Sequence, residues 1–507
     1  MEVLHQLMMG FQVAATPLNL LWALVGAFVG TIVGVLPGIG PLGSMAILLS
    51  FTLNMEATTA MIFFAGIYYG SMYGGSTTSI LLNIPGEAAS VVTCIDGYKM
   101  AQKGRGGAAL TISAVGSFAA GTLSIIGLMF AATILADAAL KFGPPEFFAI
   151  GSVGLLFLVR LSGGSLIKNV IMLLLGLALA TIGTDHLYGI PRFTFGISEL
   201  GQGVEFLPVA MGLFGIAEVM LTALEKDEVG EMIRVRMRDL LPTLVEWKRS
   251  FAPILRGSFL GFFIGLLPGP SPVISTFVSY MAEKKASKHP EEFGEGAIEG
   301  VAGPESANNA ASEGALVPLL ALGVPTGPVP AVLLAALMVH GITPGPLFIK
   351  EQPVVFWGLI ASMYVGNLVL LLLNLPMVGL FVNLLRVPYK ILYPTILLFC
   401  VVGVYAVNSS MVDVGIMSVM GVLGYFLRKM DFETAPLVLG VVLAPIIEFS
   451  FRQALAMSGG SYTIFVERPI AVVFLAIALI MILLGLKPLI FRKKDWRERL
   501  TDAEKSA

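Results

Sequence analysis

A pattern of glycines and prolines occurs twice in this chain. Its first copy contains Gly26, Gly30, Gly34 and Leu36-Pro37-Gly38, and its second contains Gly257, Gly261, Gly265 and Leu267-Pro268-Gly269 at the same internal spacing. Farther along, Leu82-Asn83-Ile84-Pro85-Gly86 corresponds to Leu322-Gly323-Val324-Pro325-Thr326. Chance is a poor explanation for so many coincident glycines and prolines. The sequence therefore predicts two equivalent repeat units, over residues 18–136 and 254–385.

The composition places these units in a membrane. Hydrophobic residues make up 56% of the chain and charged residues only 13%, which is too much apolar surface for one water-soluble core. Several apolar runs are about long enough to cross a bilayer core of roughly 30 Å as helices: Ala108–Ala136, Val170–Gly183, Val354–Leu375, Ile391–Val407 and Ile470–Leu486. No period-2 alternation typical of a membrane barrel occurs. We expect an all-α polytopic membrane protein with about 11 full crossings.

Basic residues predict the topology, because Lys and Arg are retained on the cytoplasmic side. None precedes Lys99, and later ones cluster at 99–105, 226–249, 284–288, 428–429 and 492–494. The N-terminus is therefore predicted outside and the C-terminus inside. Between and after the repeat units we expect scaffold helices over 137–224, a basic cytoplasmic linker over 225–253, C-terminal helices over 386–490 and a cytoplasmic tail over 491–507.

The same charges give the two units opposite orientations. The loop around Asn54–Glu56 lacks Lys and Arg, whereas its counterpart, Lys284–Lys288, is basic. The next pair of loops reverses this, because Lys99–Arg105 is basic and His340–Gln352 holds one Lys beside a Glu. Inverted repeats are an architecture of secondary transporters, which bind their substrates near the bilayer midplane.

Short apolar arms indicate re-entrant hairpins. Ile254–Leu267 and Pro272–Ala282 would span roughly 21 and 17 Å as helices, short of a full crossing. Basic residues flank this pair on both ends, so the chain is predicted to enter and leave on one side as a hairpin over 254–283. The other hairpins predicted by this reasoning lie at 18–53, 74–95 and 314–339. Simple turns between full crossings are the alternative.

Breaks of this kind expose backbone groups that bind ions. A half-helix that starts after Pro or Gly points free N–H groups into the gap, which suits a carboxylate. Carbonyls at the preceding helix end suit Na⁺. The substrate-binding candidates at the breaks are Gly38, Gly40, Gly75, Ser76, Thr77, Thr78, Ser271, Pro325, Thr326 and Gly327. The hydroxyl groups of Ser76–Ser79 have an alternative role, which is to bond back to their own helix carbonyls.

A polar run, Gly300–Gly314, lies between apolar segments and contains no Lys or Arg. Its Asn308 and Asn309 need several hydrogen-bond partners each, so they and Ser306 complete the predicted substrate site. Glu305, Glu313 and Asn83 are the candidates for ion coupling, because intramembrane carboxylates can carry protons or Na⁺. For Glu305, a capping role at a helix start is the alternative.

Other chemistries lack their motifs. Cys94 and Cys400 show no metal or disulfide spacing, no phosphate-binding loop occurs, and the four histidines are scattered. We therefore expect no enzyme, no cofactor, and no metal beyond Na⁺, with Na⁺ or H⁺ as the coupling ion. The basic linker is explained by retention inside the cell near membrane lipid, rather than by nucleic acid.

Two motifs resemble those of a known family. Tyr73-Gly74-Gly75-Ser76-Thr77-Thr78-Ser79, continuing through Pro85-Gly86 to Asp96-Gly97-Tyr98, is the first. Gly303-Pro304-Glu305-Ser306-Ala307-Asn308-Asn309, continuing to Gly323-Val324-Pro325, is the second. Both resemble the large membrane subunit, or permease, of the tripartite tricarboxylate transporters, over roughly residues 18–450. Thr326 departs from the Pro-Gly pair common in that family.

The resemblance implies a permease in the bacterial inner membrane with two partners, a small membrane subunit of about four helices and a periplasmic solute-binding protein. It implies import of tricarboxylates or other small carboxylates, driven by an ion gradient. Helix breaks in inverted units favour alternating access, of an elevator type by analogy with other hairpin-containing carriers. A passive anion channel or other pore-forming protein is the alternative, and it would need a continuous polar pore.

Overall fold

The computed structural model describes residues 2–36, 40–161, 165–185, 189–223, 240–375, 377 and 389–491. Within these residues the protein is built from helices, apart from one short antiparallel pair of strands in which Gly183 lies opposite Arg192. This agrees with the predicted all-α class.

The elements of the N-terminal part are α1 (Glu2–Ala14), α2 (Pro17–Val35), α3 (Gly40–Leu49), η1 (Ser50–Thr52), α4 (Ala57–Leu82), η2 (Ala88–Ser90), α5 (Val91–Gln102) and α6 (Gly106–Ala139). The following segment contains α7 (Pro144–Leu161), α8 (Leu166–Ala180), β1 (Gly183–Thr184), β2 (Pro191–Arg192), η3 (Glu199–Gln202), α9 (Phe206–Ala210), the π-helix η4 (Met211–Ile216) and α10 (Ala217–Thr222).

The second half contains α11 (Leu244–Gly265), α12 (Ser271–Ala286), η6 (Pro290–Glu292), α13 (Glu299–Gly314), α14 (Leu316–Leu322), α15 (Pro328–Val339), α16 (Phe348–Glu351) and α17 (Pro353–Asn374). The C-terminal part contains α19 (Tyr389–Asn408), α20 (Met411–Lys429), α21 (Ala435–Met457), α22 (Ile464–Glu467) and α23 (Pro469–Phe491).

Among the described residues, five helices are long and apolar enough to cross a bilayer: α2, α6, α17, α20 and α21. Shorter apolar helices, such as α8 and α15, accompany them. The chain is therefore a multi-pass helical membrane protein. The total number of crossings, the orientation of the termini and the inverted repeat stay predictions.

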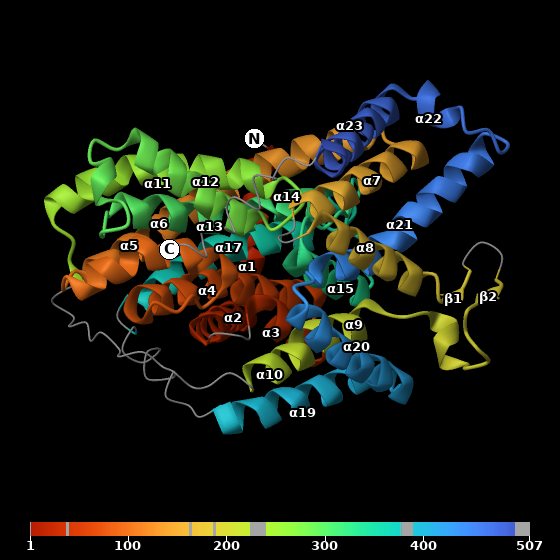
Figure 1. Ribbon diagram of the computed structural model, residues 1–507, viewed down its shortest axis with the longest axis horizontal. Coiled ribbons are helices and arrows are strands. Elements are labelled where there is room, and N and C mark those ends of the chain that lie inside the picture. Colours follow the sequence, from red (N-terminus) through yellow and green to blue (C-terminus); the bar gives the residue numbers. More distant parts are fainter. Residues whose placement is uncertain are drawn as a thin grey trace.

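The helices form a central body with two flanking groups (Figure 1). The body contains α2, α4, α6, α11, α13 and α17, which pack on one another. One flanking group consists of α7, α8, α21 and α23, and the other of α9, α10, α19 and α20. In the body, α4 is buried from Thr58 to its end at Leu82, so the core is built around a helix that lipid cannot reach.

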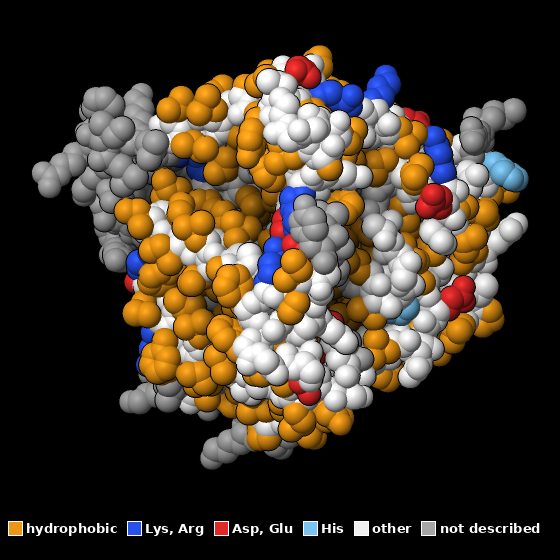
Figure 2. Space-filling model, turned by 90° about the vertical axis from the view of Figure 1, so that its right-hand side faces the viewer, with side chains coloured by type: hydrophobic (Ala, Val, Ile, Leu, Met, Phe, Trp, Pro, Cys, Tyr) orange, Lys and Arg blue, Asp and Glu red, His pale blue; other side chains and the backbone are white. Residues whose placement is uncertain are grey.

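On the side of the molecule that carries β1 and β2, hydrophobic side chains cover much of the left part, acidic and basic ones lie together near the centre, and other charged side chains lie toward the top and right (Figure 2). Ion pairs fasten the strand region to α21. Arg192 bonds Glu448 at 2.7 Å, and Arg452 bonds Asp185 at 2.7 Å. Beyond β2, Phe195 is 82% exposed. These ion pairs hold an apolar surface segment in place at one end of the helices.

Glycines allow two pairs of body helices to approach closely. Along α2, a Cβ at Gly26, Gly30 or Gly34 would lie 2.1 to 2.5 Å from backbone oxygens of α4. Along α11, a Cβ at Gly257, Gly261 or Gly265 would lie 2.3 to 2.4 Å from backbone oxygens of α13. Small residues serve this purpose in membrane helices, where packing replaces the hydrophobic effect between helices. The repeated glycines are thus packing faces, used in the same way in each half.

Two central helices end at the sequence breaks. At the end of α4, Asn83 caps the helix with φ of 59°, and at the end of α14, Gly323 does so with φ of 71°. Both residues adopt the left-handed conformation that commonly ends a helix. However, α4 begins at Ala57, and α14 follows α13 almost without interruption. The arms that precede these breaks are therefore longer than the predicted starts at residues 74 and 314 imply.

Helix α11 starts before the predicted second unit, whose bounds stay a prediction. Helix α11 begins at Leu244, not at residue 254, and contains 22 residues. Thr243 and Glu246 form a capping box that starts it, because each side chain bonds the backbone N–H of the other. The end of the predicted linker is therefore helical, and the argument from a short arm does not apply to α11. The linker residues 224–239 lie outside the described residues.

Gly261→Ala is expected to destabilise the protein, because its Cβ would lie 2.3 Å from the carbonyl oxygen of Ala307. Overpacking of this kind costs about 1–3 kcal/mol. The measurement is the midpoint temperature of heat-induced aggregation of the detergent-solubilised protein. Gly415→Ala is the matched control, since no atom lies within 4 Å of its added Cβ. Equal midpoints for the two variants would contradict the close packing of α11 on α13.

Candidate functional site

Helix α13 carries the polar run and is buried from Glu299 to Gly314. Helices α6, α11 and α12 pack around it. Pro304 lies inside the helix, which continues past it. Glu305 is therefore in the interior of α13, beyond its first turn, so the alternative role of Glu305 as a cap at a helix start is wrong.

The Glu305 carboxylate accepts hydrogen bonds from hydroxyl groups on three helices. Ser113 of α6 donates to Oε2 at 2.9 Å, and Ser76 of α4 donates to the same oxygen. Thr93 of α5 donates to Oε1. Glu305 is 1% exposed. Three helices of the first half thus converge on one buried carboxylate of the second half.

The two asparagines extend this cluster along α13. Asn308 donates from Nδ2 to Glu87 Oε1 at 2.8 Å, and Asn309 donates to Ser117 Oγ at 2.7 Å. The Asn308 Oδ1 and Ser306 Oγ atoms are buried without a hydrogen-bond partner among the described residues. Buried polar atoms normally have partners, so these two oxygens are exceptions within the described part of the chain, and their role in binding a substrate stays a prediction.

Glu313 lies about two turns beyond Glu305 on α13 and is 3% exposed. Its Oε2 has no hydrogen-bond partner within the described part of the chain. Its Oε1 faces Gly121 of α6, where a Cβ would lie only 2.9 Å away. The residue is thus enclosed by protein, and its role in ion coupling stays a prediction.

No basic side chain neutralises these acids. In the described ranges, Glu87, Glu305 and Glu313 form no ion pair with Lys or Arg. The same ranges contain no group of three or more His, Cys, Asp or Glu side chains that could hold a metal ion. The cluster therefore consists of carboxyl, hydroxyl and amide groups.

The hydroxyl residues after Gly75 differ in what they contact. Thr78 and Ser79 bond back to the Gly75 carbonyl at 3.1 and 3.0 Å, which is the alternative role considered for them. Ser76 bonds the Met72 carbonyl at 3.1 Å and also reaches Glu305. Thr77 is buried in the same helix. Of this group, Ser76 is the one that the structure joins to the polar cluster.

The breaks of the second half lie against each other. The Gly269 N–H donates to the Thr326 carbonyl at 2.7 Å, and a Cβ at Gly327 would lie 3.3 Å from the Gly269 oxygen. Ser271 is buried at the start of α12, directly after this contact. Pro325 belongs to the same segment between α14 and α15. The predicted candidates of these two breaks are thus neighbours.

In the first half, the break after α4 also packs closely on a neighbouring segment. A Cβ at Gly86 would lie 2.0 Å from the Gly34 oxygen, so the break after α4 packs on α2. Gly40 starts α3 with φ of 61°, and Gly38 lies outside the described residues. Asn83 is exposed at the end of α4, where its left-handed backbone gives a structural reason for asparagine.

Sequence reasoning missed Glu87, Thr93, Ser113 and Ser117. Ser113 and Ser117 lie one turn apart in a largely apolar helix, and that spacing was an available signal. Glu87 has a local role in a capping box with Ser90, but nothing near Glu87 or Thr93 in the sequence indicates their partners on α13. Glu305, Asn308 and Asn309 are each at most 2% exposed. The polar cluster is thus closed to solvent in this conformation.

Two uncharacterized proteins of Agrobacterium vitis are similar to this chain. A protein of Agrobacterium vitis described as the uncharacterized 52.8 kDa protein in the TAR-I ttuC' 3' region is 48% identical over 496 residues, which cover 98% of each chain. An uncharacterized protein in the TAR-II ttuC' 3' region of the same organism is 49% identical over 235 residues, covering 46% of this chain and 97% of that protein. No solved structure matches the chain.

The profile of the tripartite tricarboxylate transporter TctA family matches residues 20–439. These residues include both motifs from which the resemblance was drawn, and all of α13. The chain therefore belongs to the tripartite tricarboxylate transporter TctA family, which is a family of transporters.

Proposed function

We propose that this protein is the permease subunit of a secondary active importer for tricarboxylates or related small carboxylates in the bacterial inner membrane. A periplasmic binding protein delivers the substrate, and a small membrane subunit completes the system. Membership of the family supports the class of transporter. The observation that carries the proposal is the buried polar cluster of α13, with its free Asn308 and Ser306 oxygens.

The charge of this cluster supports coupling to a cation. Glu305 is buried and accepts hydroxyl groups, but no Lys or Arg pairs with it among the described residues. An ionised carboxylate is costly in such a place unless a proton or Na⁺ neutralises it. We therefore assign ion coupling to Glu305, with H⁺ or Na⁺ as the ion. Glu313 is the second candidate.

Closure of the cluster supports alternating access over the channel alternative. Glu305, Asn308 and Asn309 are at most 2% exposed, whereas a continuous polar pore would wet its lining. Substrate can reach these residues only after helices move. In the elevator mechanism that we propose, α13 and the helices bonded to it move against the flanking helices as one body.

The double substitution Asn308→Ala with Asn309→Ala should abolish most uptake, because it removes the amides that face Glu87 and Ser117. Loss of two buried hydrogen bonds predicts a fall of at least about tenfold. The measurement is uptake of radiolabelled citrate, tartrate, succinate and benzoate by cells that also express both partner subunits.

Asn374→Ala is the matched control, because among the described residues this buried asparagine bonds only within its own helix. Uptake is expressed per molecule of permease in the membrane. Normal uptake by the double variant, at normal abundance, would exclude the asparagines from the site.

Glu305→Gln should separate exchange from accumulation. The amide keeps an acceptor oxygen for the hydroxyl groups but cannot carry a proton or supply a full negative charge to Na⁺. In proteoliposomes we expect exchange of internal for external carboxylate to continue, and accumulation driven by an imposed H⁺ or Na⁺ gradient to fall at least about tenfold. Glu351→Gln, near the surface in α16, is the control. Unchanged accumulation by the Glu305 variant would rule out coupling at this residue.

A further inference from the structure

Asp96 of α5 is buried, although it lies close to the basic cluster at 99–105 that is predicted to be cytoplasmic. Its Oδ1 atom accepts the backbone N–H groups of Gly294, Gly296 and Ala297 at 2.9, 2.7 and 2.9 Å. These three groups belong to the loop that leads into α13. One carboxylate oxygen of the first half thus holds the loop of the second half by three charge-assisted hydrogen bonds.

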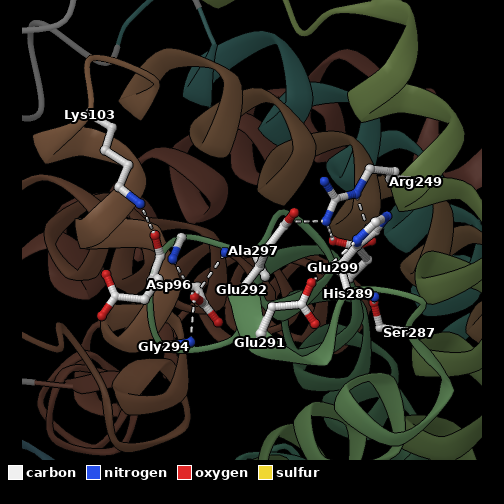
Figure 3. Close-up of polar contacts among 12 residues, drawn as sticks. Asp96, Lys103, Arg249, Ser287, His289, Glu291, Glu292, Gly294, Ala297 and Glu299 are labelled. Atoms are coloured by element: carbon white, nitrogen blue, oxygen red, sulfur yellow. Dashed lines mark hydrogen bonds and ion pairs between the residues drawn. The ribbon is translucent and has the colours of Figure 1, made fainter.

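The loop is held from its other side as well (Figure 3). Arg249 of α11 bonds Glu299 at 2.8 Å through two nitrogens, and it bonds Glu292 at 2.5 Å. Lys103, near the end of α5, donates to the Glu295 carbonyl. The lead-in to α13 is therefore fixed between α5 and α11.

Glycine is needed where Asp96 meets this loop. A Cβ at Gly300, in the first turn of α13, would lie 2.2 Å from Asp96 Oδ2. Gly296 adopts φ of 105°, a conformation that L side chains rarely take. The loop thus curls around the carboxylate and presents its N–H groups to it. Asp96 is the first residue of the Asp96-Gly97-Tyr98 motif. This motif is not part of the transport site proposed above.

The same helix, α5, also contributes to the polar cluster. Thr93, one turn before Asp96, donates to Glu305, and Ala297, the last loop residue that Asp96 binds, lies two residues before α13 begins. Helix α5 therefore touches α13 at two levels, once at the loop and once at Glu305. A shift of α13 along α5 would break both contacts together.

We propose that Asp96 is a positioning residue for the transport site. By fixing the start of α13 to α5, it keeps Glu305 in register with its hydroxyl donors, and it makes the two halves travel as one body. This inference rests on the proposed function, because it assigns Asp96 a role in the coupling of the same site.

The first test compares Asp96→Ala, Asp96→Asn and Gly300→Ala, using the labelled acid that the wild-type protein accumulates. Asp96→Ala and Gly300→Ala disturb the contact from opposite sides. Both should raise the Na⁺ or H⁺ activity needed for half-maximal uptake at least about tenfold, since they release Glu305 from its donors. Asp96→Asn keeps an acceptor oxygen and should stay within about threefold of the wild type.

Glu291→Ala is the matched control, an exposed acid of the same loop whose partner is His289 at 3.5 Å. A merely structural role would lower the amount of protein without changing the cation activity for half-maximal uptake. That result for both Asp96→Ala and Gly300→Ala would overturn the proposal. Absence of uptake by the wild type would instead refute the proposed function.

A second test does not depend on the folding of these variants. Cysteines replace Lys103 and Glu295 in a protein with Cys94→Ala and Cys400→Ala, and a short reducible thiol cross-linker joins them. If the two halves travel as one body, uptake should stay within about twofold of the uncross-linked protein, as for any contact kept throughout the cycle. Loss of uptake on cross-linking, restored by reductant, would show that α5 and the loop must separate.

Discussion

The burial of α13 is the constraint on which the rest of this structure depends. Lipid offers no hydrogen-bond partner, so every polar group of this helix must be satisfied by protein or by a bound ligand. Apolar helices alone cannot meet that demand. The helices around α13 accordingly bring Ser76, Thr93 and Ser113 to Glu305. Glycines of α11 then allow a close approach that excludes lipid from the opposite side.

The sequence was sufficient to predict features that depend on local pattern. Hydrophobic runs predicted the helical membrane class. The ends of α4 and α14 fall at the predicted breaks because Asn83 and Gly323 are residues that tolerate a left-handed backbone. Each of these outcomes is decided within a few residues, so a single sequence carries the information.

Features that depend on distant partners could not be predicted in this way. Glu87 was not among the predicted site residues, and its bond to Asn308 joins positions from opposite halves of the chain. Arg249 was assigned to a basic linker because its charge was counted without its partner Glu299. The start of α11 was missed although Thr243 and Glu246 form a local capping signal. The capping signal could have been recognised in the sequence. The pairs Glu87–Asn308 and Arg249–Glu299 could not, because only the fold brings their members together.

The proposed function raises a question of charge that the cluster itself helps to answer. A carboxylate substrate is an anion, and the buried acids Glu305 and Glu313 and the half-buried acid Glu87 all belong to this polar cluster. Hydroxyl and amide groups and helix ends supply partial charges only, and no Lys or Arg pairs with these acids in the described residues. Substrate binding next to ionised glutamates would therefore be opposed by repulsion in a low-dielectric setting. On the proposed function, a cation that neutralises Glu305 removes this repulsion before it drives transport. Coupling then follows from binding, because the site accepts its anionic substrate well only when the cation is already present.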